Sequence, residues 1–304
     1  MVGAGSVAVL LTRALETNKH NEVTYYVREG RKAKLPRVKL LEARTGALYV
    51  RERPAVVEPK STLPKVDTVI LPVRGDQLDE ALDVVARLGD GVRIASASAG
   101  IDDVARIRAR FPGRAVVQIL PAVMAYPEAD TTKWWIPPFA KTVVSYESDD
   151  AAKELAEDLV KDFTAGGVPS RVVRAVGAAR DAFVGAGMPL LASLELAGWD
   201  FGAWSRSGEL RGLASSGMRE GLRAVLGKPA ARFVGLAPAP LLSVMLRAFP
   251  SLAPKGVLDM WRVHGPKIAG QTRAMLDTII ARGADRAAAT DHLRELRRRL
   301  DAAQ

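Results

Sequence analysis

Residues 1–28 read MVGAGSVAVLLTRALETNKHNEVTYYVR, and this stretch decides the fold. A glycine-rich turn at Gly3–Gly5 leads into an apolar stretch with helical spacing that ends near Leu15. A polar turn at 17–21 follows, and Val23–Val27 is rich in the β-branched and aromatic residues that favour a strand. Turn, helix, turn and strand form the first half of a βαβ unit, so the sequence predicts an α/β domain of the Rossmann type.

The glycine turn has the spacing G-x-G-x-x-A, which is typical of dinucleotide sites. Gly3 permits a tight turn, Gly5 lets a pyrophosphate approach the backbone, and the small Ala8 lets the helix pack closely on the sheet. The N-terminus of the helix, at Ser6 and Val7, offers free N–H groups and a favourable dipole to phosphate oxygens. We therefore predict a cofactor site at these residues, with a purely structural glycine turn as the alternative.

Basic residues follow the second predicted strand. Arg28 comes directly after the strand, and Arg31 and Lys32 lie close behind it. A site for NAD(H) places a carboxylate about 20 residues beyond the glycines to accept the ribose hydroxyls, but Glu29 is one position late and flanked by cations. Because a guanidinium matches the geometry of a phosphate, this pattern favours NADP(H) over NAD(H).

The first strand of this fold is short in the sequence. Only Met1 and Val2 precede Gly3, whereas strands are on average about five or six residues long. We expect either a very short first strand or a chain that, as given, lacks its natural start.

Strand and helix patterns alternate through the rest of the N-terminal half, which favours a doubly wound parallel sheet. The expected elements are a β-hairpin of 37–44 and 47–53, strands at 66–73, 92–97 and 115–120, and helices at 78–88 and 102–110. The pattern breaks at 121–141, where we expect a structured loop or an irregular extension of the sheet. In that stretch Trp134, Trp135 and Phe139 have two interpretations, as the wall of a hydrophobic substrate pocket or as packing or dimer contacts.

The change from a mixed to a helical pattern indicates two domains. Ser148 is the expected N-cap of a helix that runs to about Phe163, and strand signals fade after Pro169. The prediction is a Rossmann-like, NADP(H)-binding domain at 1–167 and an all-α domain at 168–304 for substrate binding and dimerisation.

Composition narrows the classes of function. The chain has no cysteine, and its three histidines are far apart in sequence, so we expect no metal site. No apolar run reaches the roughly 18 residues of a membrane span, and no signal peptide opens the chain, so we expect a cytoplasmic protein without membrane contact. The net charge of +10 invites a nucleic-acid interpretation, but aromatic residues make up 6% and none alternates with the basic ones.

The chain resembles the ketopantoate reductase family over essentially its whole length. The resemblance lies in the order of elements, the Gly3-Ala4-Gly5-Ser6-Val7 opening, the arginine after the second strand and the helical C-terminal half. That family carries K-x-x-Q after its fourth strand, where this sequence has Arg74-Gly75-Asp76-Gln77, and tends to have Asn-Pro-Leu near the position of Met188-Pro189-Leu190. The resemblance implies NADPH as hydride donor, Arg74 and Gln77 beside it, a 2-keto acid reduced between the domains, a lysine as general acid, and a homodimer.

Polar residues that the family uses for substrate are changed here. By alignment, the family's catalytic lysine falls on Arg180 and its partner asparagine on Val184. The loop asparagine falls on Ala99, which the resemblance places beside the cofactor, and the substrate-binding glutamate falls on about Lys267. Cofactor features are thus kept and substrate features are not, so we expect a substrate other than ketopantoate.

Two residues remain as catalytic candidates. Arg180 can stabilise negative charge but is a poor proton donor, and its alternative role is a salt bridge at the domain interface, to neighbours of Asp181 or to an acid of the other domain. His264, in a segment that we expect to form a turn at Gly265-Pro266, is the candidate proton donor, with a structural role as the alternative.

Three hypotheses follow. The leading one is an NADPH-dependent reductase of this superfamily that acts on a small-molecule carbonyl or imine. The second is a catalytically silent NADP(H)-binding protein that senses or regulates. Nucleic-acid binding is the third and the weakest.

Overall fold

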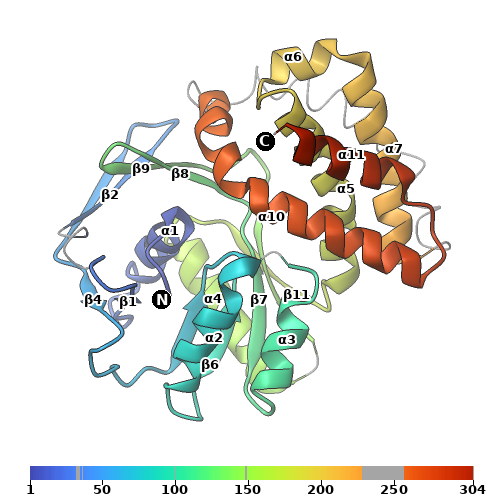
Figure 1. The fold of residues 1–304 in the computed structure, drawn as a ribbon. Coiled ribbons are helices and arrows are strands. Elements are labelled where there is room, and N and C mark those ends of the chain that lie inside the picture. Colours follow the sequence, from blue (N-terminus) through green and yellow to red (C-terminus); the bar gives the residue numbers. More distant parts are fainter. Residues whose placement is uncertain (32–34, 36, 99, 148, 228–256, 304) are drawn as a thin grey trace. The chain divides into compact units, whose positions relative to one another are not determined.

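Three adjacent parallel strands form one side of the main sheet, namely β5 (Thr68–Leu71), β6 (Arg93–Ser96) and β7 (Val116–Leu120). β10 (Thr142–Tyr146) pairs antiparallel with β7, and β11 (Ser170–Arg174) pairs parallel with β10, which gives the strand order β11-β10-β7-β6-β5 (Figure 1). The parallel part confirms the predicted Rossmann-like sheet.

Val2 joins this sheet to a smaller one. Its N–H donates to the carbonyl oxygen of Ile70 at 2.9 Å, and it forms an isolated parallel bridge with Tyr26. Tyr26 ends β1 (Thr24–Tyr26), which pairs parallel with β4 (Ala55–Val57). The backbone of residues 1–3 is thus hydrogen-bonded to β5 on one side and to β1 on the other.

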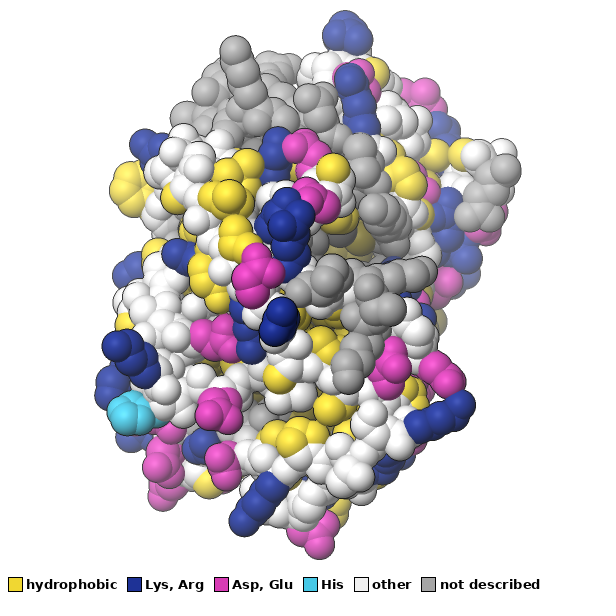
Figure 2. Space-filling model, turned by 90° about the vertical axis from the view of Figure 1, so that its left-hand side faces the viewer, with side chains coloured by type: hydrophobic (Ala, Val, Ile, Leu, Met, Phe, Trp, Pro, Cys, Tyr) yellow, Lys and Arg dark blue, Asp and Glu magenta, His cyan; other side chains and the backbone are white. Residues whose placement is uncertain are grey.

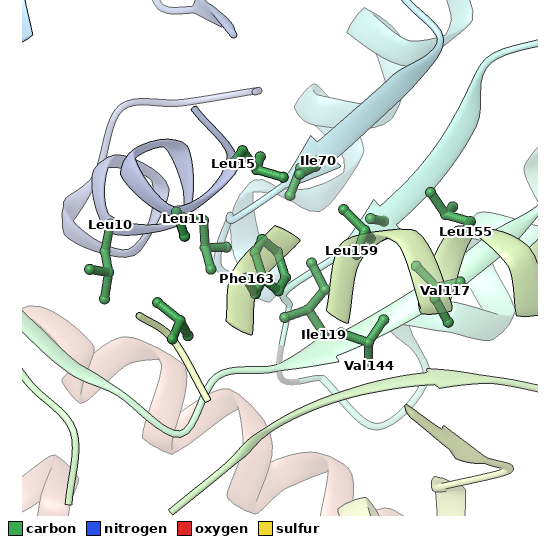
Figure 3. Packing of buried hydrophobic residues seen from close by; sticks show 14 of the residues in the cluster. Leu10, Leu11, Leu15, Ile70, Val117, Ile119, Val144, Leu155, Leu159 and Phe163 are labelled. Atoms are coloured by element: carbon green, nitrogen blue, oxygen red, sulfur yellow. The ribbon is translucent and has the colours of Figure 1, made fainter. Parts of the chain in front are cut away.

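Helices cover both faces of the main sheet. α1 (Ser6–Leu15) and α4 (Asp150–Ala165) pack on one face, and α2 (Leu78–Ala86) and α3 (Asp103–Arg110) pack on the other. Because side chains alternate along a strand, neighbouring residues of β5 enter opposite cores. Figure 3 shows the core under α1 and α4, formed by Leu10, Leu11, Leu15, Ile70, Val117, Ile119, Val144, Leu155, Leu159 and Phe163.

A second sheet has the order β3-β2-β9-β8. The expected hairpin is confirmed as β2 (Arg37–Glu42) and β3 (Leu48–Glu52). The segment 121–141, expected as a loop or an irregular extension, contains a regular hairpin of β8 (Met124–Glu128) and β9 (Thr131–Trp135), and β9 pairs parallel with β2. Pro127 argued against a strand in the sequence, because proline cannot donate a hydrogen bond within a sheet. β8 tolerates this proline because it is an edge strand.

The two tryptophans of this hairpin are packed in the interior, and Phe139 lies in the segment after it. Trp134 and Trp135 are buried, and Trp134 belongs to the core under α1. The guanidinium of Arg13 lies 5.3 Å from the centroid of the Trp134 ring. Phe139 is fully exposed. Packing is therefore the correct interpretation of the two tryptophans.

The N-cap of α4 lies one residue later than predicted. Asp149 is its N-cap, and its carboxylate accepts a hydrogen bond from the Ala152 N–H at 2.6 Å. Ser148, the predicted cap, lies outside the described residues. An aspartate satisfies the free N–H groups of a helix as well as a serine does, and here it also brings a negative charge to the helix N-terminus.

The computed structural model describes residues 1–31, 35, 37–98, 100–147, 149–227 and 257–303, without the side chains of 257–260, 263, 264 and 267. The chain divides into two compact units, Met1–Val176 and Gly177–Gln304. The boundary comes later than residue 167 because β11, which the sequence did not predict, completes the main sheet of the first unit.

The described part of the second unit is helical, as expected. Its helices are α5 (Gly177–Leu196), α6 (Phe201–Arg206), α7 (Gly208–Leu226), α10 (Val257–Asp285) and α11 (Asp291–Ala302). Gly185 of α5 and Gly221 of α7 touch through their backbones, where a Cβ on Gly221 would overlap the Gly185 carbonyl oxygen. The turn expected at Gly265-Pro266 is wrong, because both residues lie inside the continuous helix α10.

Candidate functional site

A cavity of about 500 Å³ lies in the first unit, where β1 and β5 end. Its lining comes from the glycine turn at 2–5, from residues 26–28 and 31 after β1, and from residues 72–84 after β5. Ligands in open α/β sheets bind at the carboxyl ends of the strands. The cavity brings together five of the residues predicted to bind the cofactor, namely Gly3, Gly5, Arg28, Arg31 and Gln77.

The glycine turn has the geometry that its sequence predicts. Gly3 has a φ of +93°, which side chains with a Cβ rarely adopt. Gly5 is the N-cap of α1, and the first helical hydrogen bond runs from the Val9 N–H to the Gly5 carbonyl at 3.0 Å. The N–H groups of Ser6 and Val7 thus lie at the open end of the helix, next to Gly5, although neither residue lines the cavity.

Arg28 enters the cavity directly after the buried Val27 and meets a carboxylate there. Its Nε donates to Oε1 of Glu80 at 3.2 Å, and its Nη2 donates to Oε2 at 2.7 Å. Glu80 lies on α2 and lines the same cavity. The hydrogen bond and the charge of Glu80 raise the pKa of the Arg28 guanidinium, which therefore stays charged.

The other charged residues near the end of β1 differ from Arg28. Arg31 lines the cavity, and among the residues that the structure describes it has no acidic partner within ion-pair distance. Glu29 does not line the cavity, and its carboxylate pairs with the Lys60 ammonium at 2.6 Å. Lys32, the third predicted cation, lies outside the described ranges.

Sequence reasoning missed Glu80, although a signal was present. Gln77 was predicted to bind the cofactor, and it immediately precedes α2. Residues three, four and seven positions later share a helical face with it, and Glu80, Ala81 and Val84 indeed line the cavity with Gln77. Extending the prediction from Gln77 along its helical face would have found the carboxylate.

Arg74 is engaged with a near neighbour. Its Nε and Nη2 donate to the carboxylate of Asp76 at 2.9 and 2.7 Å, and it does not line the cavity. The same ion pair lowers the pKa of Asp76, chiefly through its hydrogen bond to Arg74. The motif predicted from Arg74 to Gln77 thus contributes Gln77 to the cavity wall and Arg74 to its surroundings.

Ala99 lies outside the residues that the structure describes, but the loop on either side of it is held by a buried carboxylate. The Gly100 N–H donates to Oδ2 of Asp103 at 3.0 Å, and the Ser98 hydroxyl donates to the same oxygen. A Cβ at Gly100 would overlap that carboxylate. Asp103 therefore shapes the loop that follows β6.

The second unit contains the predicted catalytic arginine. Both Nε and Nη2 of Arg180 donate to Oδ1 of Asp181, at 2.9 and 2.7 Å, and Nη1 of Arg282 lies 3.4 Å from Oδ2. The side chain of Arg180 is 12% exposed, so this cluster is largely withdrawn from water. Val184, one helical turn after Arg180, is buried. His264 lies within α10, and its side chain is not among those described.

Other kinds of site receive no support from the described residues. Among them, no group of three or more His, Asp or Glu side chains could hold a metal ion. No helix in the described ranges is long and apolar enough to cross a membrane. On the face shown in Figure 2, the Lys and Arg side chains are interspersed with Asp and Glu rather than gathered in one basic patch.

Comparison with known proteins finds one family model that is similar to the N-terminal part of the chain. Residues 1–133 match the family model of the ketopantoate reductase PanE/ApbA. No curated protein sequence matches the chain significantly.

Solved structures with the same fold span nearly the whole chain. The 2-dehydropantoate 2-reductase of Geobacter metallireducens has a TM-score of 0.77 at 15% identity, covering 100% of this chain and 98% of that one. A dimeric ketopantoate reductase from Staphylococcus aureus has a TM-score of 0.71 at 14% identity, covering 99% and 96%. A D-mandelate dehydrogenase with bound NADH and anilino(oxo)acetate has a TM-score of 0.71 at 14% identity, covering 99% and 97%.

Proposed function

We propose that the protein is an NADPH-dependent reductase of a carbonyl or imine other than ketopantoate, a proposal supported by the match of residues 1–133 to the family model of the ketopantoate reductase PanE/ApbA. The observation that carries this proposal is the single cavity shared by the Gly3–Gly5 turn, Arg28, Arg31 and Gln77. The turn and the open end of α1 would bind the pyrophosphate, and the arginines would bind the 2′-phosphate of the adenosine ribose.

The preference for NADP(H) over NAD(H) rests on the charges at the end of β1. Two guanidinium groups, Arg28 and Arg31, line the cavity, while the nearest carboxylate in sequence, Glu29, pairs with Lys60 instead. A guanidinium can donate two hydrogen bonds to a phosphate but has no acceptor for a ribose hydroxyl. Since a similar fold binds NADH in the mandelate dehydrogenase, these side chains and not the fold must carry the preference.

Substitution of Arg28 tests the cofactor assignment. Arg28→Ala should weaken NADPH binding by about tenfold or more, because charge-assisted hydrogen bonds contribute roughly 1.5–3 kcal/mol, and should affect NADH binding little. Calorimetric titration of both nucleotides measures this. Arg110→Ala is the matched control, since Arg110 is exposed, pairs with Asp83 and lies away from the cavity lining. Equal losses for the two nucleotides would rule out the 2′-phosphate role.

For catalysis, the bound cofactor would supply a hydride, and Arg180 is the residue that we propose to stabilise negative charge on the substrate oxygen. Its guanidinium is largely withdrawn from water and held in place by Asp181, which supports an oriented charge at this position. Because an arginine does not release its proton, the proton would come from His264 or from water. Ketopantoate is disfavoured because the buried Val184 offers no hydrogen bond where the family has an asparagine.

A silent NADP(H)-binding protein is the second candidate, favoured by the ion pair of Arg180. The guanidinium is engaged by Asp181 within the second unit, so an ion pair inside this unit is a structural role that Arg180 can have without catalysis. A panel of 2-keto acids, ketones and imines, followed by NADPH consumption, separates the two candidates. Turnover of any member at a rate that Arg180→Ala abolishes supports the reductase, and NADPH binding without any turnover supports the silent protein.

We also propose that the protein is a homodimer. The support is the fold that it shares with the dimeric Staphylococcus aureus reductase. Light scattering on the purified chain tests this, and a monomer mass at micromolar concentration would contradict it.

A further inference from the structure

The carboxylate of Glu80 occupies the cavity that we assign to the adenosine end of NADP(H). It comes from α2 and not from the end of β1, where NAD-type sites carry their acid. Both oxygens of Glu80 accept from Arg28, at 3.2 and 2.7 Å, so the pair is bidentate. The Nε–Nη2 edge of the guanidinium is thus already occupied before any phosphate arrives.

The two arginines of the cavity are therefore not equivalent. Arg31 has no acidic partner among the described residues, whereas Arg28 is neutralised by Glu80. A 2′-phosphate, with nearly two negative charges, would compete with the Glu80 carboxylate for Arg28 and would be repelled by it. A 2′-hydroxyl carries no charge and would feel neither effect.

We propose that Glu80 is a specificity-determining residue, an inference that rests on the proposed cofactor. By holding Arg28, Glu80 reduces the preference of this site for the 2′-phosphorylated nucleotide. The two side chains are about equally exposed, at 64% for Arg28 and 60% for Glu80, so water screens their pair and the phosphate can displace it. Glu80 acts through Arg28 and is in this sense a positioning residue.

The test compares Glu80→Gln with the parent chain by calorimetric titration of NADPH and NADH. Removal of the competing charge should tighten NADPH binding by about three- to tenfold and change NADH binding by less than about twofold. Asp83→Asn is the matched control, because Asp83 is an exposed acid on the same helix, pairs with Arg110 and does not line the cavity. This control removes the same charge and should leave both affinities unchanged.

A second background shows whether Glu80 acts through Arg28. In Arg28→Ala the competition for Arg28 no longer exists, and only the repulsion between the phosphate and the exposed Glu80 carboxylate remains, which water screens. The further change Glu80→Gln should therefore tighten NADPH binding by less than about twofold in this background, which is less than in the parent chain. The same gain in both backgrounds would overturn the proposal. Weaker NADH binding with unchanged NADPH binding in Glu80→Gln would also overturn it, because Glu80 would then accept the ribose hydroxyls.

The outcomes separate this inference from the function on which it rests. If the parent chain shows no saturable NADPH binding, the cofactor proposal fails and this inference fails with it. If the parent chain binds NADPH but Glu80→Gln and Asp83→Asn have equal effects on its affinity, only the role of Glu80 is overturned.

Discussion

Gly3 shows at the scale of one residue how backbone conformation and binding are linked. Its φ of +93° lets the chain leave the short first strand and turn into α1 without a side chain in the way. No other atom lies within 4 Å of a Cβ built at this position, so the constraint comes from the backbone angle and not from crowding.

Gly3→Ala should therefore destabilise the fold by about 1–3 kcal/mol, the usual cost of a strained backbone angle, and should weaken NADPH binding. Urea denaturation measures the first effect and calorimetry the second. Gly91→Ala is the control, since that glycine also has open space around it but no positive φ. Equal stability of Gly3→Ala and the parent chain would contradict this account.

The candidate site could be predicted in part, residue by residue. Gly3, Gly5, Arg28, Arg31 and Gln77 follow from spacing and charge, and the structure brings them to one cavity. Helical spacing from Gln77 could have placed Glu80 at the cavity but not its pairing with Arg28, because that contact joins side chains 52 positions apart in the chain. Spacing along a sequence does not reveal which acid will meet which base across a fold.

At the scale of elements, the crossing of α5 and α7 depends on a pair of glycines. A Cβ at Gly221 would overlap the backbone of Gly185, so the two helices approach more closely than larger residues permit. Gly221→Ala should destabilise the second unit by about 1–3 kcal/mol through overpacking.

Gly212→Ala is a matched control on the same helix, because nothing lies within 4 Å of its Cβ position. This change should stabilise the protein by about 0.5–1 kcal/mol, since alanine favours a helix more than glycine does. Thermal denaturation of both variants tests the pair. A similar effect of the two substitutions would show that the helices can separate at no cost.

The N-terminus of α11 is capped by a residue that is distant in the sequence. Glu220 of α7 is buried, and its carboxylate accepts from the backbone N–H groups of His292 and Leu293, at 2.9 and 3.1 Å. Glu220→Ala should cost about 1–3 kcal/mol and increase amide exchange at the start of α11. Glu209→Ala, which removes an exposed acid of the same helix, should change stability by less than about 0.5 kcal/mol. An unchanged exchange rate in Glu220→Ala would show that this cap does not hold the helix.

At the scale of the whole molecule, nucleotide binding should be visible as unequal stabilisation. The cavity is lined only by residues of the first unit, so NADPH should protect amides there. At a concentration of 100 times Kd the expected gain is about 2.7 kcal/mol. Hydrogen exchange with and without NADPH measures it for each segment. Protection confined to the second unit would contradict the assigned site.

The fold was predictable where the sequence pattern of a segment matches the place of that segment in the folded protein. The alternation of strands and helices from β5 to β7 was predicted correctly, because these buried parallel strands are largely apolar and alternate with helical patterns. β8 and β11 were missed for different reasons. β8 contains a proline, which argues against a strand. In β11 the two valines Val172 and Val173 are flanked by arginines, so the composition of β11 does not indicate a strand, and β11 forms one by pairing with β10.

The far end of α1 has a consequence for ligand binding. There Arg13 donates to the Gly166 carbonyl at 3.0 Å and lies against Trp134, and the amides of Asn18 and Asn21 both donate to Asp162. The helix is thereby tethered at the end remote from the glycine turn. The turn itself is held by the bond from the Gly3 N–H to the Tyr26 carbonyl at 2.7 Å. Because both ends of the helix are fixed in the folded protein, binding of the nucleotide should proceed without a slow ordering step.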